Sequence, residues 1–151
     1  MRYACLIYYD PRSLFGGSPE ANAALDECST YDVKLKESGH FVMGEALVLP
    51  EEAMTVQVRR GKMSTVDGPF IETKEMLGGI VVIEARDLDE AVRVAGGHPL
   101  ATIGSVEVRP VVDLKRAGLA TIEAVLRCRK RARSVRPPAR HAIARRDRGP
   151  G

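Results

Sequence analysis

The sequence predicts an α+β protein of the ferredoxin-like class, a split βαβ sandwich followed by a basic C-terminal extension. The first observation is the length of 151 residues, which suits about one domain. The second is the order of the apolar patterns, which runs strand, helix, several strands, helix, strand. The third is a change from acidic to basic composition near Asp113.

The first strand and the first helix are expected within residues 2–39. Residues 2–9 are rich in Tyr, Leu and Ile and end at a turn, which is typical of a strand. Ser18 is a candidate N-cap with Pro19 at the first helical position, and apolar residues recur at helical spacing as far as Leu35. Gly39 is expected to end this helix by adopting the left-handed conformation.

The middle of the chain is expected to form strands. Residues 41–49 are one candidate. A hairpin is expected next, with residues 53–59 turned by Gly61 into residues 62–66. Residues 78–85 form the most apolar candidate, so they should be central in the sheet.

A second helix and a last strand complete the pattern. Asp87 and Glu90 have capping-box spacing, and apolar residues follow on one face until Gly96. Residues 106–112 are the last strand. Pro110 cannot donate to a β-ladder, so this strand should lie at an edge of the sheet.

Two helices cover only one face of such a sheet. Residues 80–83 are nevertheless apolar on both faces, whereas an exposed antiparallel sheet shows one polar face. We therefore predict a homodimer in which sheet packs against sheet. The alternative cover is the C-terminal segment, which has apolar residues at helical spacing: Leu119, Ile122, Val125 and Leu126.

The charge pattern separates a domain, residues 1–113, from a tail, residues 114–151. The domain has 11 Lys and Arg against 18 Asp and Glu, a balance of −7, and the tail has 12 against 2, a balance of +10. The tail is expected to be partly helical or disordered, and it could bind nucleic acid weakly by neutralising phosphates without reading bases. The alternative is an extension without a selected role.

Several classes of protein are not indicated. No apolar stretch approaches the ~20 residues that span a bilayer, and the first residues lack the order of a signal peptide, so we expect a cytoplasmic protein without membrane contact. Cys5, Cys28 and Cys128 form no metal or disulfide pattern. The sequence has no phosphate loop, dinucleotide fingerprint or HExxH motif, so no cofactor and no metal are predicted.

The most distinctive stretch is residues 65–79, TVDGPFIETKEMLGG. Together with Gly44 to Leu47 before it and Gly104 to Val111 after it, it makes the chain resemble the YCII-related family, in its DGPF-motif branch, over about residues 1–113. The resemblance implies a dimeric α+β barrel made of ferredoxin-like halves, and it implies little about activity.

The wider family suggests two directions. Relatives of this branch occur beside or fused to extracytoplasmic-function sigma factors, and distant relatives in the same superfamily include cofactor-free isomerases, lyases and monooxygenases. Relatives outside the branch are thought to use a His/Asp pair early in the chain. This sequence has no histidine before His40, so that chemistry does not transfer directly.

Two groups of residues are candidates for a site. Asp67, in a turn, would stand with Phe70, Glu72 and Lys74 at the mouth of a cleft, and the alternative is a purely structural turn. Glu107 and Arg109 lie two apart on a strand and should face away from its apolar residues. They would either bind an anion or form a salt bridge near the dimer interface.

These observations lead to two hypotheses. The first is a cofactor-free small-molecule binding protein or enzyme of the proton-transfer, isomerase or lyase type. Asp67 and His98 would be its catalytic groups, since an imidazole in a loop can act near neutral pH. Arg109 would anchor an organic or anionic ligand, lined by Glu107, Glu72, Lys74 and Phe70. The alternative is an accessory or regulatory module for an extracytoplasmic-function sigma factor.

Overall fold

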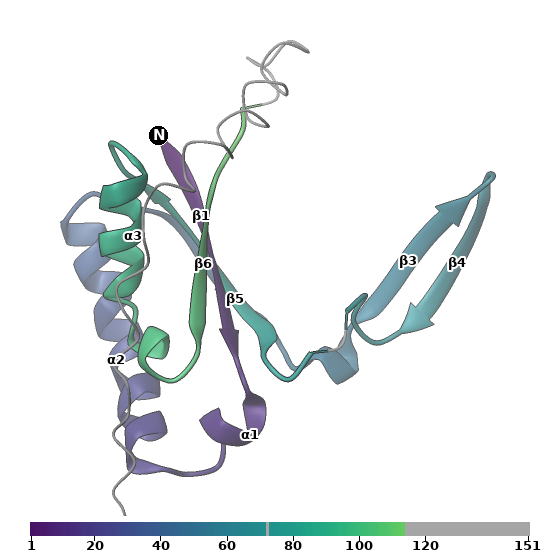
Figure 1. Cartoon of the computed structure of the whole chain (residues 1–151), viewed down its shortest axis with the longest axis horizontal. Coiled ribbons are helices and arrows are strands. Elements are labelled where there is room, and N and C mark those ends of the chain that lie inside the picture. The colour runs from purple at the N-terminus through teal and green to yellow at the C-terminus, as the bar shows by residue number, and fades with distance from the viewer. Residues whose placement is uncertain (72, 114–151) are drawn as a thin grey trace, which may run out of the picture. The chain divides into compact units, whose positions relative to one another are not determined.

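The computed structural model describes residues 1–71 and 73–113. Four strands form an antiparallel sheet in the order β2-β5-β1-β6 (Figure 1). They are β1 (Arg2–Tyr9), β2 (Phe41–Ala46), β5 (Met76–Glu84) and β6 (Ser105–Pro110). Two helices, α2 (Pro19–Glu37) and α3 (Leu88–Gly96), lie on the same face of this sheet. This order with two helices is the ferredoxin-like arrangement, so the predicted α+β fold class is confirmed.

The hairpin between β2 and β5 forms a separate two-stranded sheet of β3 (Met54–Arg59) and β4 (Lys62–Asp67). Three short helices complete the described elements: α1 (Pro11–Leu14), η1 (Pro50–Glu52) and η2 (Pro99–Thr102). All of them belong to the first of two units into which the chain divides, Met1–Val111 and Val112–Gly151. The predicted boundary at Asp113 stays a prediction, and the tail lies outside the described residues.

Strand β1 is central because both of its faces suit burial. Its alternate residues Tyr3, Cys5, Ile7 and Tyr9 are buried under the helices. The residues between them point to the other face, as the two-residue period of a strand requires. Strand β1 pairs with β5 on one side and β6 on the other, so it carries the centre of the core.

Helix α2 begins and ends where the sequence predicts. The Ser18 hydroxyl accepts a hydrogen bond from the Ala21 N–H at 3.2 Å, and Pro19 occupies the first helical position, where its missing N–H costs nothing. Gly39 follows the helix with φ of 74°, the left-handed conformation that glycine adopts without a steric penalty.

Helix α3 has the predicted cap at Asp87, but its Glu90 side chain accepts from a different backbone N–H than in a capping box. The Asp87 carboxylate accepts from the Glu90 N–H at 2.8 Å, as a capping residue does. The Glu90 carboxylate reaches back to the Arg86 N–H, one residue before the cap, at 2.6 Å. Ala91 and Ala95 on the buried face of the helix allow it to lie close to the sheet.

Some predicted boundaries were wrong. The second strand ends at Ala46 and not at Leu49, because a 3-10 helix begins at Pro50. The turn predicted after Tyr9 is the short helix α1, since the Asp10 carboxylate caps it by accepting from the Arg12 N–H at 3.0 Å. The loop predicted after residue 97 contains helix η2. The last strand ends at Pro110, and β6 is an edge strand as predicted.

The sheet face opposite α2 and α3 is called the open face below. Half-buried apolar residues of β1 and β5 form its centre: Ala4, Leu6, Ile80 and Val82. No described helix packs on this face (Figure 1). The predicted sheet-to-sheet homodimer stays a prediction.

None of the helices within the described ranges is long and apolar enough to cross a membrane. A cytoplasmic location stays a prediction.

Candidate functional site

A cluster of three polar residues interrupts the apolar open face. Tyr8 on β1 and Glu107 and Arg109 on β6 form this group, called the open-face cluster below. The register places Glu107 opposite Leu6 and Arg109 opposite Ala4, so both side chains share the open face. Val106 and Val108 pack against the core on the other face, as predicted.

Glu107 joins the other two members of the cluster. One carboxylate oxygen, Oε1, accepts from Nε of Arg109 at 2.6 Å, and Oε2 accepts from the Tyr8 hydroxyl at 3.5 Å, a long and weak contact. The hydrogen bond and the charge of Glu107 raise the pKa of the Arg109 guanidinium. The side chain of Arg109 is 64 % exposed. Glu107 thus fixes the position of a cation whose outer edge faces solvent.

Further polar contacts hold residues 73–75, the segment before β5, at the end of the sheet beside Tyr8. The Ser105 hydroxyl donates to a carboxylate oxygen of Glu75 at 3.0 Å, and the Thr73 hydroxyl donates to the Glu75 carbonyl. Lys74 forms an ion pair with Asp10 at 3.7 Å. The partner of Lys74 is therefore the cap of α1. Glu72 lies outside the described residues.

Asp67 and Phe70 stand on the hairpin side of the structure, and both are exposed. Asp67 ends β4, is exposed, and its side chain makes no hydrogen bond or ion pair with any described residue. The turn is held instead by backbone groups of Gly68, whose N–H donates to the Ala53 carbonyl at 2.7 Å. Phe70 is 74 % exposed, and its role as an aromatic wall stays a prediction.

His98 is buried, although the sequence predicts it in a loop where an imidazole could act as a general acid or base near neutral pH. Its Nδ1 accepts from the Leu100 N–H at 3.2 Å and so caps helix η2. Its ring meets the edge of the Tyr31 ring at 5.0 Å between centroids. Burial lowers the pKa of His98, and the charge of Asp32 opposes this in part. These contacts give His98 a structural role in its neutral form.

Of the six predicted site residues within the described part of the chain, the structure brings Glu107 and Arg109 together. His98 contacts residues of the helical layer, and Asp67 contacts neither His98 nor Arg109 by any hydrogen bond or ion pair. The catalytic roles of Asp67 and His98 stay predictions without geometric support. Sequence reasoning missed Tyr8, although the alternation of residues 2–9 places it opposite the buried Tyr9.

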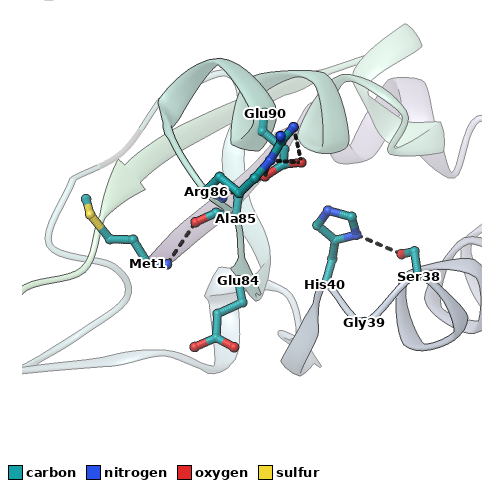
Figure 2. Close-up of a pocket in the computed structure, with 8 residues that line it drawn as sticks. All are labelled: Met1, Ser38, Gly39, His40, Glu84, Ala85, Arg86 and Glu90. Atoms are coloured by element: carbon teal, nitrogen blue, oxygen red, sulfur yellow. Dashed lines mark hydrogen bonds and ion pairs between the residues drawn. The ribbon is translucent and has the colours of Figure 1, made fainter.

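An open pocket of about 420 Å³ lies at the other end of the sheet. Figure 2 shows the residues that line it. Residues from the start of β1, the end of α2 and the β5–α3 connection line it: Met1, Ser38, Gly39, His40, Glu84, Ala85, Arg86 and Glu90. None of these residues is predicted from the sequence as part of a site.

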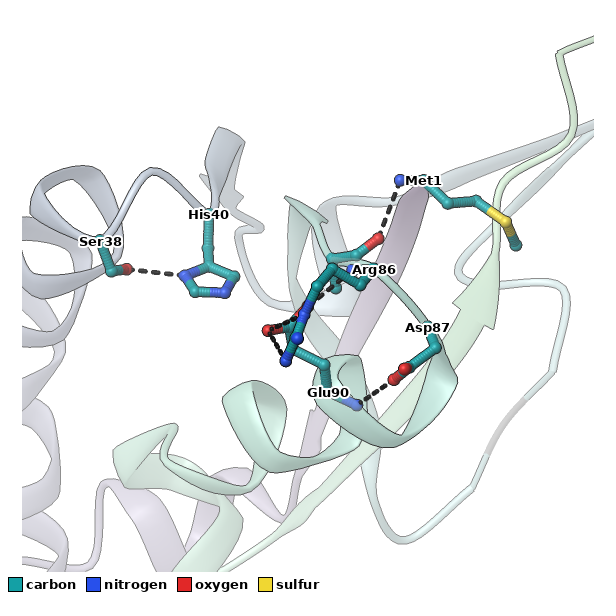
Figure 3. A network of polar contacts seen from close by, with 7 residues as sticks. Met1, Ser38, His40, Arg86, Asp87 and Glu90 are labelled. Atoms are coloured by element: carbon teal, nitrogen blue, oxygen red, sulfur yellow. Dashed lines mark hydrogen bonds and ion pairs between the residues drawn. The ribbon is translucent and has the colours of Figure 1, made fainter.

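The polar groups around this pocket pair with one another (Figure 3). The Arg86 guanidinium bonds the Glu90 carboxylate at 2.9–3.1 Å, and these bonds with the Arg86 N–H hold the pKa of Glu90 at about 2. Nδ1 of His40 lies 2.8 Å from the Ser38 hydroxyl, and the Met1 amine donates to the Ala85 carbonyl at 2.8 Å. The network joins the start of the sheet to helices α2 and α3. Because its polar groups already have partners, we assign no ligand to this pocket.

Both described cysteines are poor nucleophiles. Cys5 is buried, which raises its pKa to about 11. Burial also raises the pKa of Cys28, and the charges of Asp32 and Glu27 add to this. No three His, Cys, Asp or Glu side chains within residues 1–71 and 73–113 are grouped as a metal site would need. The thiolate chemistry of a cysteine enzyme therefore finds no support in these two residues.

The fold and the open-face cluster define a ferredoxin-like α+β domain with a polar site on an antiparallel sheet. The family model of the YCII-related domain matches residues 1–115, so the chain belongs to the YCII-related family. An uncharacterized protein of Rhizobium meliloti (strain 1021) is 35 % identical over 118 residues, which cover 76 % of this chain and 95 % of that protein. The narrower DGPF-motif branch stays a prediction.

Among solved structures, the chain is similar to 5-chloro-2-hydroxyhydroquinone dehydrochlorinase (TftG) of Burkholderia phenoliruptrix AC1100, in complex with 2,5-dihydroxybenzoquinone. The identity is 16 %, the TM-score is 0.44, and the match covers 78 % of this chain and 100 % of that one. We draw no conclusion about activity from a similarity at this level.

Proposed function

We propose that this protein binds a small anionic organic molecule on the open face of its sheet, with Arg109 as the anchor and without a metal or nucleotide cofactor. The observation that carries the proposal is the hydrogen bond from Nε of Arg109 to Glu107. This bond occupies one donor of a side chain that has five. The four N–H groups on Nη1 and Nη2 make no hydrogen bond with any described residue.

The free edge of a guanidinium suits a carboxylate or a phosphate, because two parallel N–H donors match two acceptor oxygens. Glu107 holds the guanidinium in one orientation, so a ligand does not have to order it. The half-buried side chains of Ala4 and Leu6 stand opposite the two charged residues and offer apolar contact to an organic body. An anionic ligand with a small apolar part therefore fits best.

Proton transfer would be the further step of an enzyme of this kind. A general acid or base must lie within hydrogen-bond reach of the reacting group, so Glu107 and Tyr8 are better placed than Asp67 or His98 to act on a molecule held by Arg109. The isomerase- or lyase-like activity predicted above belongs to this second step.

The test is a thermal-shift screen of the full chain with small carboxylates and phosphates, followed by the variants Arg109→Gln and Arg2→Gln. Arg2 is the matched control, because its side chain is similarly exposed at 62 % and makes only a 3.9 Å contact with Glu84. A ligand that stabilises the wild type should lose its shift in Arg109→Gln and keep it in Arg2→Gln. Equal shifts in all three proteins would show that Arg109 is not the anchor.

Two further variants separate binding from the predicted catalysis. If His98→Ala and Asp67→Asn leave both the ligand-induced shift and any turnover unchanged, those two residues are no part of the site. The alternative function, an accessory module for a sigma factor, stays a prediction that no contact among the described residues favours.

A further inference from the structure

The four-stranded sheet carries all the charged side chains of its strands on the open face. There are five of them: Arg2 on β1, Glu45 on β2, Glu84 on β5, and Glu107 and Arg109 on β6. Residues that pair directly across an antiparallel ladder share a face. The register pairs Arg2 with Glu84, and it pairs Glu45 with Ile80, which pairs in turn with Leu6 of the open face.

The packing of β2 places Glu45 on this face by a second observation. A Cβ on Gly44, the residue before it, would lie 3.6 Å from the side chain of the buried Val81. Gly44 therefore faces the core. Successive residues of a strand point to opposite faces, so the Glu45 side chain points to the open face.

Four of the five charges are paired within the sheet. Arg2 lies 3.9 Å from Glu84, and Arg109 lies 2.6 Å from Glu107. Glu45 is exposed, and its side chain makes no hydrogen bond or ion pair with any described residue. Two arginines against three glutamates give the strands a balance of −1 on this face, and the uncompensated charge is that of Glu45.

Glu45 and the Glu107–Arg109 pair stand at opposite edges of the sheet. Strands β2 and β6 are three strand spacings apart. Neighbouring strands lie about 4.8 Å apart, so the Cα atoms of Glu45 and Glu107, which share one row, are about 14 Å apart. The four side chains between the two edges are half-buried and apolar: Ala4, Leu6, Ile80 and Val82.

We propose that the ligand of the open face is a zwitterion, a carboxylate joined by an extended apolar chain to an amine, and that Glu45 selects the amine. The inference rests on the proposed function, because Arg109 holds the carboxylate. It adds the chemical class of the ligand and a residue at the far edge of the sheet that determines specificity.

The charges of the face favour a zwitterion over a phosphate. Glu107 already balances the charge of Arg109, so a doubly charged phosphate would bring two further negative charges to a face with a balance of −1. An amine beside Glu45 supplies the positive charge that this face lacks. Specificity of this kind depends on repulsion of the wrong ligand as well as on attraction of the right one.

The width of the sheet selects for length. An amine on a short acid cannot reach Glu45 while its carboxylate stays on Arg109. A longer apolar chain spans the distance and lies on the half-buried side chains between the edges, where it gains from burial.

The experiment is an amide NMR titration of the full-length protein with octanoate and ω-aminooctanoate, which differ in the terminal amine. Both should shift the amides of β6, and ω-aminooctanoate should also shift those of β2. Glu45→Gln should weaken ω-aminooctanoate by about 3-fold, as expected for one exposed ion pair, and should not weaken octanoate.

Two controls isolate the role of Glu45. Glu27→Gln makes the same change in charge at an exposed position of α2, on the other side of the sheet, and should leave both affinities as they are. γ-Aminobutyrate is too short to reach both edges, so it should bind the wild type and Glu45→Gln equally. Unchanged amide signals of β1 and β5 show that each variant is folded.

The outcomes separate this inference from the proposed function. Octanoate that does not shift β6, or that binds Arg109→Gln as well as the wild type, would remove the anchor and the zwitterion together. Octanoate that depends on Arg109, with equal affinity of ω-aminooctanoate for the wild type and Glu45→Gln, would overturn the zwitterion alone. An equal loss of both ligands in Glu45→Gln would also overturn it, because Glu45 would then not act on the amine.

Discussion

Glu107 accepts a 2.6 Å hydrogen bond from Nε of Arg109, two positions further along the edge strand β6. The bond orients the guanidinium from its inner side and leaves its outer edge exposed. An ion pair within one exposed strand contributes little to stability, because solvent screens the two charges. The arrangement therefore has more consequence for what Arg109 can bind than for how the domain folds.

Arg109→Lys should weaken an anionic ligand by about 10- to 100-fold, because lysine keeps the charge and loses the planar fork that two ligand oxygens can share. Titration calorimetry with a ligand from the thermal-shift screen measures the change. Arg2→Lys is the matched control and should leave the affinity as it is. Equal affinity in wild type and Arg109→Lys would show that charge alone holds the ligand.

His98→Asn should remove a pH dependence of stability and leave the helix cap in place. Burial lowers the pKa of His98 below its ordinary 6.5, so the unfolded chain takes up a proton more readily than the folded one. The contribution of the neutral ring is therefore present above about pH 6.5 and is lost as the pH falls below it. Asparagine can still accept from the Leu100 N–H, as Nδ1 does.

Urea unfolding at pH 7 and pH 5 measures this effect. The wild type should lose more stability than His98→Asn between the two values. His40→Asn is the control, because its ring bonds Ser38 at the end of α2 and is not in the core. A wild type and a His98→Asn variant with parallel pH profiles would contradict the prediction.

The sequence predicts the fold well because the signals for it are local. The alternation of β1, the Ser18 cap and the turn at Gly61 each depend on neighbours within a few residues, and each is where it was expected. The short helices were missed because one or two turns of helix have the same composition as a turn. Asp10 and Pro11, for example, suit either form.

The candidate site was predicted only in part, because its geometry depends on distant contacts. Glu107 and Arg109 could be paired from their spacing alone. The burial of His98 could not, since Gly-His-Pro has the same local preference in a loop and in a core, and here Tyr31 of another helix covers the ring. Phe70 was assigned to a cleft on its residue type, and its side chain is exposed.

Gly104→Ala should destabilise the domain by about 2 kcal/mol, as overpacking a fixed site does. A Cβ at this position would lie 2.2 Å from the carbonyl oxygen of Tyr8, so the backbone of β1 beside the open-face cluster would have to move. Gly96→Ala is the control, because nothing lies within 4 Å of its Cβ and alanine favours a helix. Urea unfolding should therefore show a loss for Gly104→Ala and none for Gly96→Ala.

Glu90→Gln should reduce the dependence of the folding stability on pH in the acid range. The hydrogen bonds from Arg86 hold the pKa of Glu90 at about 2, below its ordinary 4.5. The folded state thus binds its proton less readily than the unfolded chain, and the contribution is present above about pH 4.5 and lost as the pH falls toward 2. Acid titration followed by circular dichroism should show a smaller loss of stability across this range in Glu90→Gln than in the wild type. Glu84→Gln, which loses only a 3.9 Å contact with Arg2, should resemble the wild type.

The basic C-terminal segment, residues 114–151, should bind duplex DNA weakly, without sequence preference and with a steep dependence on salt. Its charge balance of +10 stands against −7 for residues 1–113, and each phosphate that a basic residue neutralises releases a counterion. Fluorescence anisotropy with two unrelated duplexes across a salt series measures the affinity. A chain that ends at Asp113 should lose this binding and keep nearly the same melting temperature.

Two outcomes of this truncation would contradict the prediction. Duplex binding that survives the truncation would place the nucleic-acid surface on the acidic domain. A large fall in melting temperature would show instead that the apolar residues of this segment, such as Leu119 and Ile122, belong to the folded core.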